Sequence, residues 1–371
     1  MIKVGVTGSN GFIGWHICRT LELDAIKFEL IEFDRKWFNE SNYLDVFVSK
    51  CDIIIHLAGL NRHSEETLIY NANISLAKSL IESFTRTGFK GQVIFSSSIQ
   101  EERNNTFGNS KKVARELFAN WAKITGAKFH GVIIPNVYGA FGLPFYNSVI
   151  STFCHQLVNN ESPKIENDVK LNLIYINDLV KDIIALFNTV SNEKLIIKHT
   201  DTIMVSEILK ILINFKNKYF TNGQIPSFNN EFEINLFNTI RSYLDLKTHY
   251  PVKYKNNIDE RGNFVEIIRL ETGGQISFST SKKGVVRGNH FHKRKIERFS
   301  VIKGKAQIQL RKIGSTEIFN YYLSGDEPAY VDMPIWYTHN IKNIGDEELY
   351  TMFWINEFYD ANDPDTYFVK V

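Results

Sequence analysis

The chain has 371 residues, which exceeds the length of most single domains and favours two domains, each able to bury a core. Apolar residues make up 43% and charged residues 23%, as in ordinary globular proteins, and a net charge of +2 predicts neither nucleic acid nor an anionic membrane as a partner. Three scattered cysteines argue against a disulfide framework or a cysteine-built zinc site, and we expect a cytoplasmic protein without targeting or membrane-spanning segments.

Short β-branched runs alternate with amphipathic segments through the first half of the chain. We expect strands in IKVGVTG, FELIEF, CDIIIHLAG, QVIFSSS and FHGVIIPNVYG. Helices are predicted over residues 15–23 and 68–84, and another after Lys111. Strands that alternate with helices in this way predict a doubly wound parallel sheet with helices on both faces.

The character of the sequence changes twice after this region. From about residue 147 it is mostly helical, as in DLVKDIIALF and VSEILKILINF, which predicts a smaller region at the open end of the sheet. Beyond Tyr250-Pro251, short alternating strands with frequent glycine predict an all-β sandwich or barrel. We therefore expect a first domain over residues 1–248 and a second over residues 249–371.

A glycine-rich turn, TGSNGFIG at residues 7–14, follows the first predicted strand and opens the first helix. Gly8 permits a tight turn, Gly11 lets the backbone approach a pyrophosphate, and Gly14 allows the helix to pack closely on the strand. This context favours a dinucleotide site of the Rossmann type over a purely structural turn.

The choice between the two nicotinamide dinucleotides depends on the end of the second predicted strand. Asp34 there suits the ribose hydroxyls of NAD, whereas Arg35 and Lys36 suit the 2′-phosphate of NADP. An ordinary charged turn would look the same. We favour NADPH over NADH.

The first 250 or so residues resemble the extended short-chain dehydrogenase/reductase family, in the branch that acts on nucleotide sugars. The matching segments are TGSNGFIG, HLAG at 56–59, Asn73, FSSS at 95–98, FGNSK at 107–111 and PNVYG at 135–139. The resemblance places the family's catalytic serine, tyrosine and lysine at Ser98, Phe107 and Lys111. It implies sugar contacts from Asn136 and Asn147, and cofactor contacts from Thr7, Gly8, Asn10, Gly11, Phe12, Ile13, Gly14, Asp34, Arg35, Leu57, Ala58, Gly59 and Lys111.

Phe107 departs from that family because it has no proton to give. In a carbonyl reduction the nascent alkoxide needs a proton, which the family's tyrosine supplies after a lysine lowers its pKa. General acid catalysis is typically worth roughly 10²–10⁴-fold, so reduction should be slow unless Ser98, Tyr138 or a water stands in. A recent natural loss of the hydroxyl and an engineered Tyr→Phe change both fit the sequence, because Ser98 and Lys111 persist.

A group of metal-ligand residue types lies in the second half of the chain. Alternation puts His290 and His292 on one face of a strand, and Glu297 and His339 can converge with them if the strands close into a barrel. A lone histidine is more often a satisfied polar residue, but four such residues with glycines at both ends favour a metal. Three imidazoles and a carboxylate suit zinc, manganese, iron, nickel or copper, and we favour zinc.

The spacing of these residues resembles the cupin family. Gly284, His290, His292, Glu297 and Gly304 match its first motif, and His339 with Asn343 matches part of its second. Trp336, however, stands where that family usually has glycine.

Two further segments, at 259–266 and 283–290, resemble cupins that epimerise nucleotide-linked 4-keto sugars. In those enzymes the histidine that matches His290 is a base and no metal is needed. Arg261, Lys283 and Arg287 would suit a diphosphate, since guanidinium groups match phosphate oxygens. Solvated charge explains Lys283 equally well.

Together the halves resemble the bifunctional capsular polysaccharide enzymes of N-acetyl-L-fucosamine synthesis. The resemblance implies that the cupin epimerises carbon 3 of a UDP-4-keto-6-deoxy-N-acetylhexosamine and that the reductase domain then reduces carbon 4 with NADPH to UDP-2-acetamido-2,6-dideoxy-L-talose. It implies catalytic roles for His290, Glu297 and His339, with Tyr337 as a further candidate acid or base, and a homodimer. Two alternatives are an epimerase on a non-catalytic scaffold, and a metabolite or redox sensor.

Overall fold

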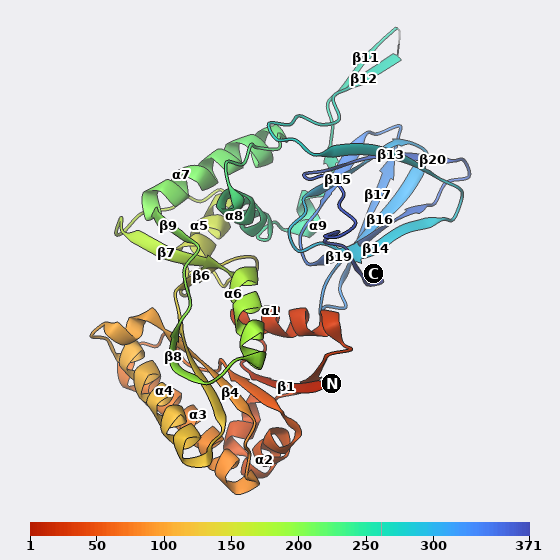
Figure 1. Ribbon diagram of the computed structural model, residues 1–371. Coiled ribbons are helices and arrows are strands. Elements are labelled where there is room, and N and C mark those ends of the chain that lie inside the picture. Colours follow the sequence, from red (N-terminus) through yellow and green to blue (C-terminus); the bar gives the residue numbers. More distant parts are fainter. Residues whose placement is uncertain (261) are drawn as a thin grey trace. The chain divides into compact units, whose positions relative to one another are not determined.

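The computed structural model describes residues 1–260 and 262–371, which form two compact units (Figure 1). The first unit comprises Met1–Thr152 and Asn167–Val205, and the second comprises Phe153–Glu166 and Ser206–Val371. The helices that precede the β-rich region thus belong to the second unit. The predicted boundary after residue 248 divides the chain by family resemblance and stays a prediction, and Arg261 lies outside the described residues.

The first unit is built on a six-stranded sheet in which all neighbouring strands are parallel. In order across the sheet these strands are β2 (Phe28–Ile31), β1 (Ile2–Thr7), β3 (Ile53–His56), β4 (Gln92–Ser98), β5 (Lys128–Ile134) and β8 (Asn192–Ile196). Every residue of β3 is buried, as expected for a strand covered on both faces. The predicted parallel sheet is confirmed.

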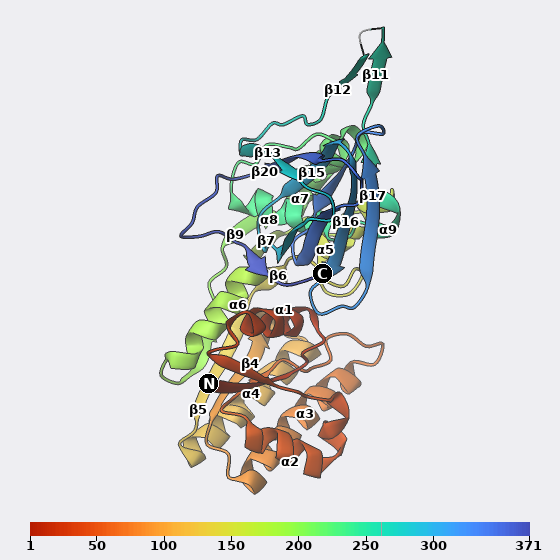
Figure 2. The same ribbon diagram turned by 90° about the vertical axis from the view of Figure 1, so that its right-hand side faces the viewer.

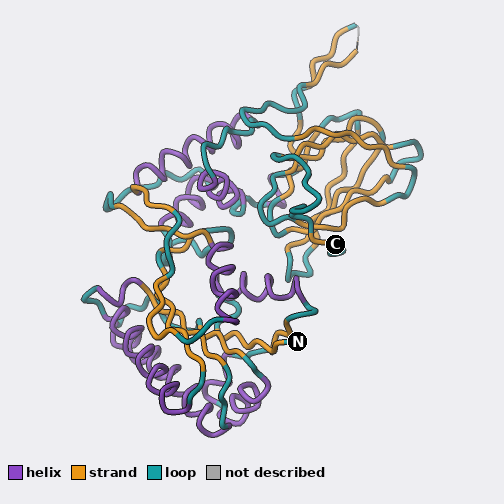
Figure 3. Tube along the Cα trace, viewed as in Figure 1, coloured by secondary structure: helices purple, strands orange, loops and turns teal. Residues whose placement is uncertain are grey.

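Helices cover both faces of this sheet (Figures 2 and 3). One face carries α2 (Ser41–Lys50), α3 (Glu66–Thr87) and α4 (Thr106–Thr125), and the other carries α1 (Phe12–Leu21) and α6 (Ile176–Ala185). Rings from strands and helices meet in one buried cluster beneath α2, α3 and α4, which includes Phe47, Phe84, Phe95, Phe118 and Phe129. This apolar layer fixes where the strand ends and helix starts of the first unit lie.

Smaller elements complete the first unit. A three-stranded sheet contains β6 (Asn136–Tyr138), β7 (Lys170–Tyr175) and β9 (Asp201–Met204). Helix α5 (Val149–Val158) begins in this unit. Single-turn helical segments occupy Glu22–Asp24, Arg35–Asn39, Ile99–Glu102 and Leu186–Asn188.

The second unit combines helices with two antiparallel five-stranded sheets. Its helices are α7 (Val205–Phe215), a turn at Lys216–Thr221, α8 (Glu231–Arg241) and α9 (Leu246–His249). One sheet has the order β10 (Val252–Lys253), β18 (Ala329–Met333), β15 (Glu297–Lys303), β20 (Leu349–Ile355) and β13 (Gln275–Ser281). The other has the order β17 (Ile318–Ser324), β16 (Lys305–Lys312), β19 (Tyr337–Asn343), β14 (Val286–Phe291) and β21 (Tyr367–Phe368). The all-β architecture predicted for the chain beyond Pro251 is confirmed.

A separate hairpin of β11 (Asn256–Asp259) and β12 (Gly262–Val265) projects away from the two sheets of its unit (Figures 1 and 2). The core between the sheets includes Ile308, Leu310, Val331 and Ile341, and along β16 the buried Ile308 and Leu310 alternate with more exposed neighbours. This alternation is what the sequence pattern predicted for a two-layered β structure.

Several predicted element boundaries were wrong: α1 begins at Phe12 instead of residue 15, FHGVIIPNVYG divides into β5 and β6, and two further boundaries bear on the site. The second strand ends at Ile31, so Asp34 lies three residues beyond it and caps the turn at Arg35–Asn39 through the N–H of Lys36. The helix expected after Lys111 begins at Thr106, because the side chain of Asn105 caps it by accepting a hydrogen bond from the N–H of Gly108. Phe107 and Lys111 therefore lie on the same helix.

Candidate functional site

The glycine turn of the first unit has the close approaches that its sequence predicted. Gly8 has a φ of 77°, in the left-handed region that favours glycine, and the N–H of Gly11 donates to its carbonyl at 2.9 Å. A Cβ on Gly14 would lie 2.2 Å from the carbonyl oxygen of Gly8, which is too close for any residue with a side chain. The start of α1 therefore packs directly against the turn, with helix N–H groups available to an anion.

The segment after β3 lies beside this turn. The N–H of Leu57 donates to the carbonyl of Thr7 at 3.1 Å, and a Cβ on Gly8 would lie 2.9 Å from the nitrogen of Ala58. The Thr7 hydroxyl lies 2.6 Å from Nδ1 of His56, which is fully buried. Burial, helped by the nearby charge of Lys111, lowers the pKa of His56 to about 3, so this imidazole is neutral. The structure thus brings two groups of predicted cofactor residues together.

Lys111 is the only buried lysine among the predicted site residues that the structure describes. Its Nζ lies 4.4 Å from the ring centre of Phe95, and burial lowers its pKa to about 8, with the charge of Glu101 opposing the shift. Phe107 precedes it by one turn on α4 and is half-buried, so the two side chains share a helix face. If residue 107 were a tyrosine, the charge of Lys111 would act to lower the pKa of the tyrosine hydroxyl.

A hydrogen-bonded chain holds this part of α4 in position. Asn73 on α3 donates to the Ser110 hydroxyl at 2.9 Å, and that hydroxyl donates to the carbonyl of Phe107 at 2.7 Å. Asn73 also accepts from the N–H of Leu60 at 2.7 Å, which ties the loop after β3 to the same network. Asn73 and Ser110 are buried, so loss of either partner would leave unsatisfied polar groups.

Ser98, at the end of β4, starts the turn at Ile99–Glu102 by accepting a hydrogen bond from the N–H of Gln100 at 3.2 Å. The carboxylate of Glu101 in that turn is held by a buried, two-pronged ion pair with Arg115 of α4. A Cβ on Gly108 would lie 1.9 Å from the carbonyl oxygen of Gln100. These contacts fix the carboxyl end of β4 against the start of α4, where the predicted serine and the Phe107 position both lie.

The remaining predicted residues of the first unit are more exposed. The Asp34 carboxylate is occupied by the N–H of Lys36 at 3.0 Å and by its Nζ at 3.6 Å, whereas Arg35 is exposed. Asn136 and Asn147 are exposed, and Asn136 donates to the carbonyl of Asn172 at 3.2 Å. Their predicted sugar contacts stay predictions.

Four side chains in the second unit converge on one point. His290, His292, Glu297 and His339 each present a ligand atom, and these atoms all lie within 4.8 Å of one another. His292, Glu297 and His339 are buried and His290 is half-buried, so the group is reachable from one side. His290 and His339 come from one sheet and Glu297 from the other, so the cluster lies where the two sheets face each other.

A β-bulge aligns two of these histidines. The pairing of β14 with β19 shifts register between Gly288 and His290, and the extra residue, Asn289, has a φ of 62°. The shift pairs His290 directly with His339, so the two rings lie 4.6 Å apart on the same sheet face.

The proton positions on two rings favour a cation at this point. Nδ1 of His292 lies 2.6 Å from the carbonyl oxygen of Asp365, and Nδ1 of His339 lies 3.3 Å from that of Tyr337. A carbonyl oxygen only accepts, so each Nδ1 carries the hydrogen and each Nε2 faces the cluster. These Nε2 atoms lie 3.3 and 3.2 Å from Oε2 of Glu297, and Nε2 of His339 is buried without hydrogen-bond geometry.

The ionisation of the cluster suits metal binding. Burial, reinforced by His339 and His292, lowers the pKa of His290 to about 3, which leaves it neutral with a free lone pair. Burial acts to raise the pKa of Glu297, but the imidazoles of His292 and His339 outweigh it and hold that pKa well below its usual range. Three imidazoles and one carboxylate match the ligands of Zn²⁺ and other divalent ions, so the residues fit the predicted metal.

Trp336 keeps the backbone conformation of the glycine that the cupin pattern usually has at this position. It has a φ of 63°, in the region that favours glycine, and its N–H donates to the carbonyl of His292 at 2.8 Å. The backbone turn is therefore kept although the side chain differs, and the indole is fully buried against Phe291 at a ring distance of 5.4 Å.

Two predicted diphosphate residues lie on or near β14. Arg287 pairs with Ile341, two residues from His339, so it lies on the sheet face that carries the histidines. Its guanidinium donates to the Ser281 hydroxyl and the carbonyl of Thr280, both at 2.9 Å. Lys283 is exposed and forms an ion pair with Asp346 at 2.7 Å. The phosphate roles of both residues stay predictions.

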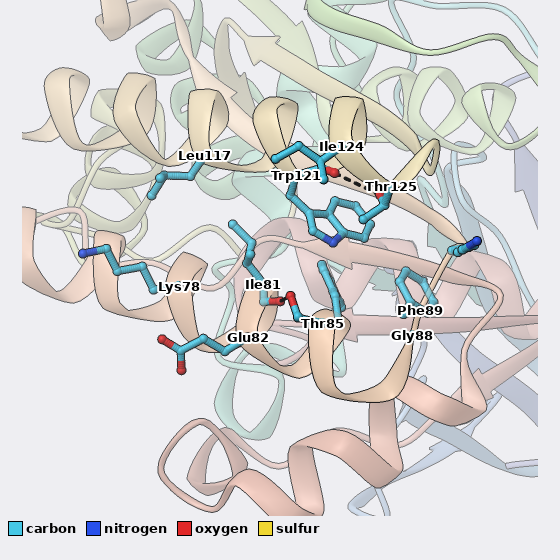
Figure 4. A pocket seen from close by; sticks show the side chains of 12 residues that line it. Lys78, Ile81, Glu82, Thr85, Gly88, Phe89, Leu117, Trp121, Ile124 and Thr125 are labelled. Carbon is cyan, nitrogen blue, oxygen red and sulfur yellow. Dashed lines mark hydrogen bonds between the residues drawn. The ribbon is translucent and has the colours of Figure 1, made fainter.

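A hollow of about 490 Å³ lies elsewhere, between α3 and α4 of the first unit (Figure 4). Apolar side chains dominate its lining, among them Ile81, Phe89, Trp121 and Ile124. It contains none of the predicted site residues, so the shape of this hollow does not locate the chemistry.

Sequence and structure comparisons place these features in a known family. Residues 4–197 match the NAD dependent epimerase/dehydratase family, and residues 257–367 match the polysaccharide biosynthesis C-terminal domain. A UDP-2-acetamido-2,6-beta-L-arabino-hexul-4-ose reductase of Pseudomonas aeruginosa is 32% identical over 376 residues, covering 100% of this chain and 99% of that protein. The chain belongs to the NAD dependent epimerase/dehydratase family. No helix in the described parts of this epimerase/dehydratase family member is long and apolar enough to cross a membrane.

Solved structures extend the likeness over the whole chain. The capsular polysaccharide assembling protein CapF from Staphylococcus aureus is 34% identical, with a TM-score of 0.63 and coverage of 100% of both chains. RMD from Pseudomonas aeruginosa complexed with NADPH, at 17% identity and a TM-score of 0.54, covers 58% of this chain and 83% of its own, and shows likeness of fold alone. The predicted resemblance to capsular polysaccharide enzymes, with a Rossmann-like unit and a cupin-like β region, is confirmed for this epimerase/dehydratase family member.

Proposed function

We propose that the chain converts a UDP-4-keto-6-deoxy-N-acetylhexosamine in two steps, epimerisation at carbon 3 and NADPH-dependent reduction at carbon 4. The product would be UDP-2-acetamido-2,6-dideoxy-L-talose. One observation carries the proposal: a His/Glu cluster within 4.8 Å lies in the same chain as a dinucleotide turn and a buried lysine. The full-length likeness to a UDP-sugar 4-ketone reductase supports the substrate class.

The first step needs a base and an acid around carbon 3. A 4-ketone acidifies the proton on that carbon, so transfer of this proton to a basic side chain leaves an enediolate, and a proton donated to the opposite face by an acid inverts the centre. A divalent cation held by His290, His292, Glu297 and His339 would supply Lewis acidity toward the ketone oxygen. Tyr337 shares the sheet face of His339, and burial raises its pKa to about 12, so its phenol stays protonated at neutral pH and holds a proton that it could donate.

The second step needs a hydride and a proton. NADPH, when bound, would supply the hydride at carbon 4, and the alkoxide left on the former carbonyl oxygen would need a proton from a side chain or from water. Lys111 keeps most of its charge at neutral pH and lies where the family's lysine binds ribose and assists the acid. The acid itself is missing at Phe107, so we expect reduction to be slower by roughly 10²–10⁴-fold than with a tyrosine.

The preference for NADPH rests on the turn after β2. The Asp34 carboxylate is engaged by Lys36, whereas Arg35 is exposed and free to meet a 2′-phosphate. An epimerase on a non-catalytic scaffold is the second candidate, and Phe107 is the observation that favours it. It predicts that a hydroxyl restored at position 107 brings no reductase activity.

Deuterium exchange separates these candidates. The wild type, Phe107→Tyr and Phe107→Leu would each receive the UDP-linked 4-keto sugar and NADPH in deuterated water. Mass spectrometry follows deuterium at carbon 3, and absorbance follows NADPH. The leucine variant controls for the altered ring, since neither leucine nor phenylalanine can donate a proton.

Three outcomes discriminate. Deuterium in all three proteins, with fast NADPH loss in Phe107→Tyr alone, supports two active sites, of which the reductase site lacks its acid when residue 107 is phenylalanine. Deuterium with no NADPH loss in any protein supports the epimerase on a scaffold. No deuterium in any protein would refute the epimerase and favour the sensor.

A further inference from the structure

One residue outside the four-residue cluster contacts His292 through its backbone and the loop that follows His292 through its side chain. Asp365, which lies just before β21, is 4% exposed. Its carbonyl oxygen accepts the Nδ1–H of His292 at 2.6 Å, the shortest contact of that ring. Asp365 was not among the site residues predicted from the sequence.

The side chain of Asp365 acts on the loop that follows His292. Its carboxylate accepts hydrogen bonds from the backbone N–H groups of Lys293, Arg294 and Lys295, at 3.1, 3.0 and 3.0 Å. Three N–H groups on one carboxylate make a charge-assisted cap that fixes the backbone between His292 and the start of β15. Two ligands of the cluster, His292 and Glu297, flank this capped loop.

Backbone conformation shows that the position is demanding. Asp365 has a φ of 41°, in the left-handed region that most residues with a side chain avoid and that Asp and Asn tolerate best. The ammonium of Lys295 also donates to the carbonyl of Pro364 at 2.7 Å. Asn238 of α8 donates to the carbonyl of Arg294 at 2.8 Å, so the loop is held from a second side.

We infer that Asp365 is a positioning residue of the metal centre, which fixes His292 with its Nε2 toward the cation and holds the loop that spaces His292 from Glu297. The inference rests on the proposed metal site. A hydrogen bond from the outer ring nitrogen of a ligating histidine to a carbonyl oxygen orients that histidine and raises its basicity. A purely structural cap would stabilise the fold without altering how the metal is held, so metal affinity is the property that discriminates.

Three variants test the role of Asp365. Asp365→Gly removes the cap and suits the positive φ, while Asp365→Asn retains an acceptor oxygen and the same conformation. Asp363→Asn is the matched control, because Asp363 is exposed and contacts the same loop only through the Arg294 side chain, at 2.9 Å. Each full-length protein is stripped of metal, refilled with Zn²⁺ or Co²⁺, and checked for folding by circular dichroism.

Two readouts are independent of catalysis. Competition with a chromogenic chelator gives the dissociation constant and release rate for Zn²⁺. The visible absorption of the Co²⁺ form reports the number and arrangement of its ligands. We expect Asp365→Gly to raise the zinc dissociation constant by about 10–100-fold with an altered cobalt spectrum, and Asp365→Asn to give a smaller rise. Asp363→Asn should match the wild type.

Equal zinc affinity and identical cobalt spectra in the wild type and both Asp365 variants would overturn the inference while the metal site stood. Loss of affinity in Asp363→Asn as large as in Asp365→Gly would also overturn it, because general loosening of the loop would then suffice. A wild type that binds neither ion would refute the proposed metal site itself, and the role of Asp365 with it.

Discussion

Replacing Lys111 with methionine should stabilise the protein at neutral pH. Burial lowers the pKa of this lysine from 10.5 to about 8, which means that the folded state holds the proton less tightly than the unfolded chain does. The difference corresponds to about 3 kcal/mol of destabilisation below pH 8, and it disappears as the pH rises past the unfolded value. Methionine fills a similar volume without a charge.

The pH dependence isolates this electrostatic cost from any packing change. We expect the stability gain of Lys111→Met over the wild type to fall by about 2 kcal/mol between pH 7 and pH 9.5, where the wild-type lysine is neutral when folded. Urea unfolding followed by fluorescence at both pH values gives the two differences. Lys112→Met is the matched control, since Lys112 is the next residue of α4 and is exposed.

A difference in unfolding free energy between Lys111→Met and the wild type that is equal at both pH values would refute the electrostatic cost of Lys111. The same pH dependence in Lys112→Met would also refute it. NADPH titration on the same proteins completes the experiment. If Lys111 is retained for cofactor binding at the expense of stability, the methionine variant should be more stable and bind NADPH more weakly.

Three further substitutions test the two units separately. Glu297→Gln should abolish stoichiometric zinc by atomic absorption and deuterium exchange at carbon 3, while calorimetric NADPH binding persists; retained zinc would contradict the ligand role. Gly14→Ala places a Cβ 2.2 Å from the carbonyl oxygen of Gly8, so the free energy of NADPH binding should become less favourable by about 1–3 kcal/mol. An unchanged affinity by calorimetry would refute the predicted clash. Asp332→Asn leaves the buried guanidinium of Arg298 without its carboxylate partner, 2.7 Å away, so the free energy of unfolding in urea should fall by roughly 3–5 kcal/mol, and an unchanged value would contradict this cost.

Much of the first unit could be predicted because its signals are local. The glycines of the turn are read from spacing alone, since Gly8 adopts a positive φ and Gly11 and Gly14 are required by their close approach to the carbonyl oxygen of Gly8. The burial of β3 likewise follows from its run of apolar residues. The start of α4 was missed because Asn105, an ordinary loop residue by composition, caps the helix through its side chain.

The metal cluster was predictable in composition but not in geometry. Alternation gave the shared face of His290 and His292, whereas the pairing of His290 with His339 depends on a bulge at Asn289 that no pattern in the sequence marked. Asp365 was missed for a related reason. It acts across 73 residues on His292, and its neighbouring Asn and Pro residues indicate only a turn.

The late position of Asp365 has a consequence for how the protein is made. His290, Glu297 and His339 are all added to the growing chain before the residue that holds His292, and Asp365 follows His339 by 26 positions. At about 5–20 residues per second, those residues take roughly one to five seconds to add. During that interval the nascent chain carries its ligands without the cap, so loading of the ion should follow synthesis rather than accompany it.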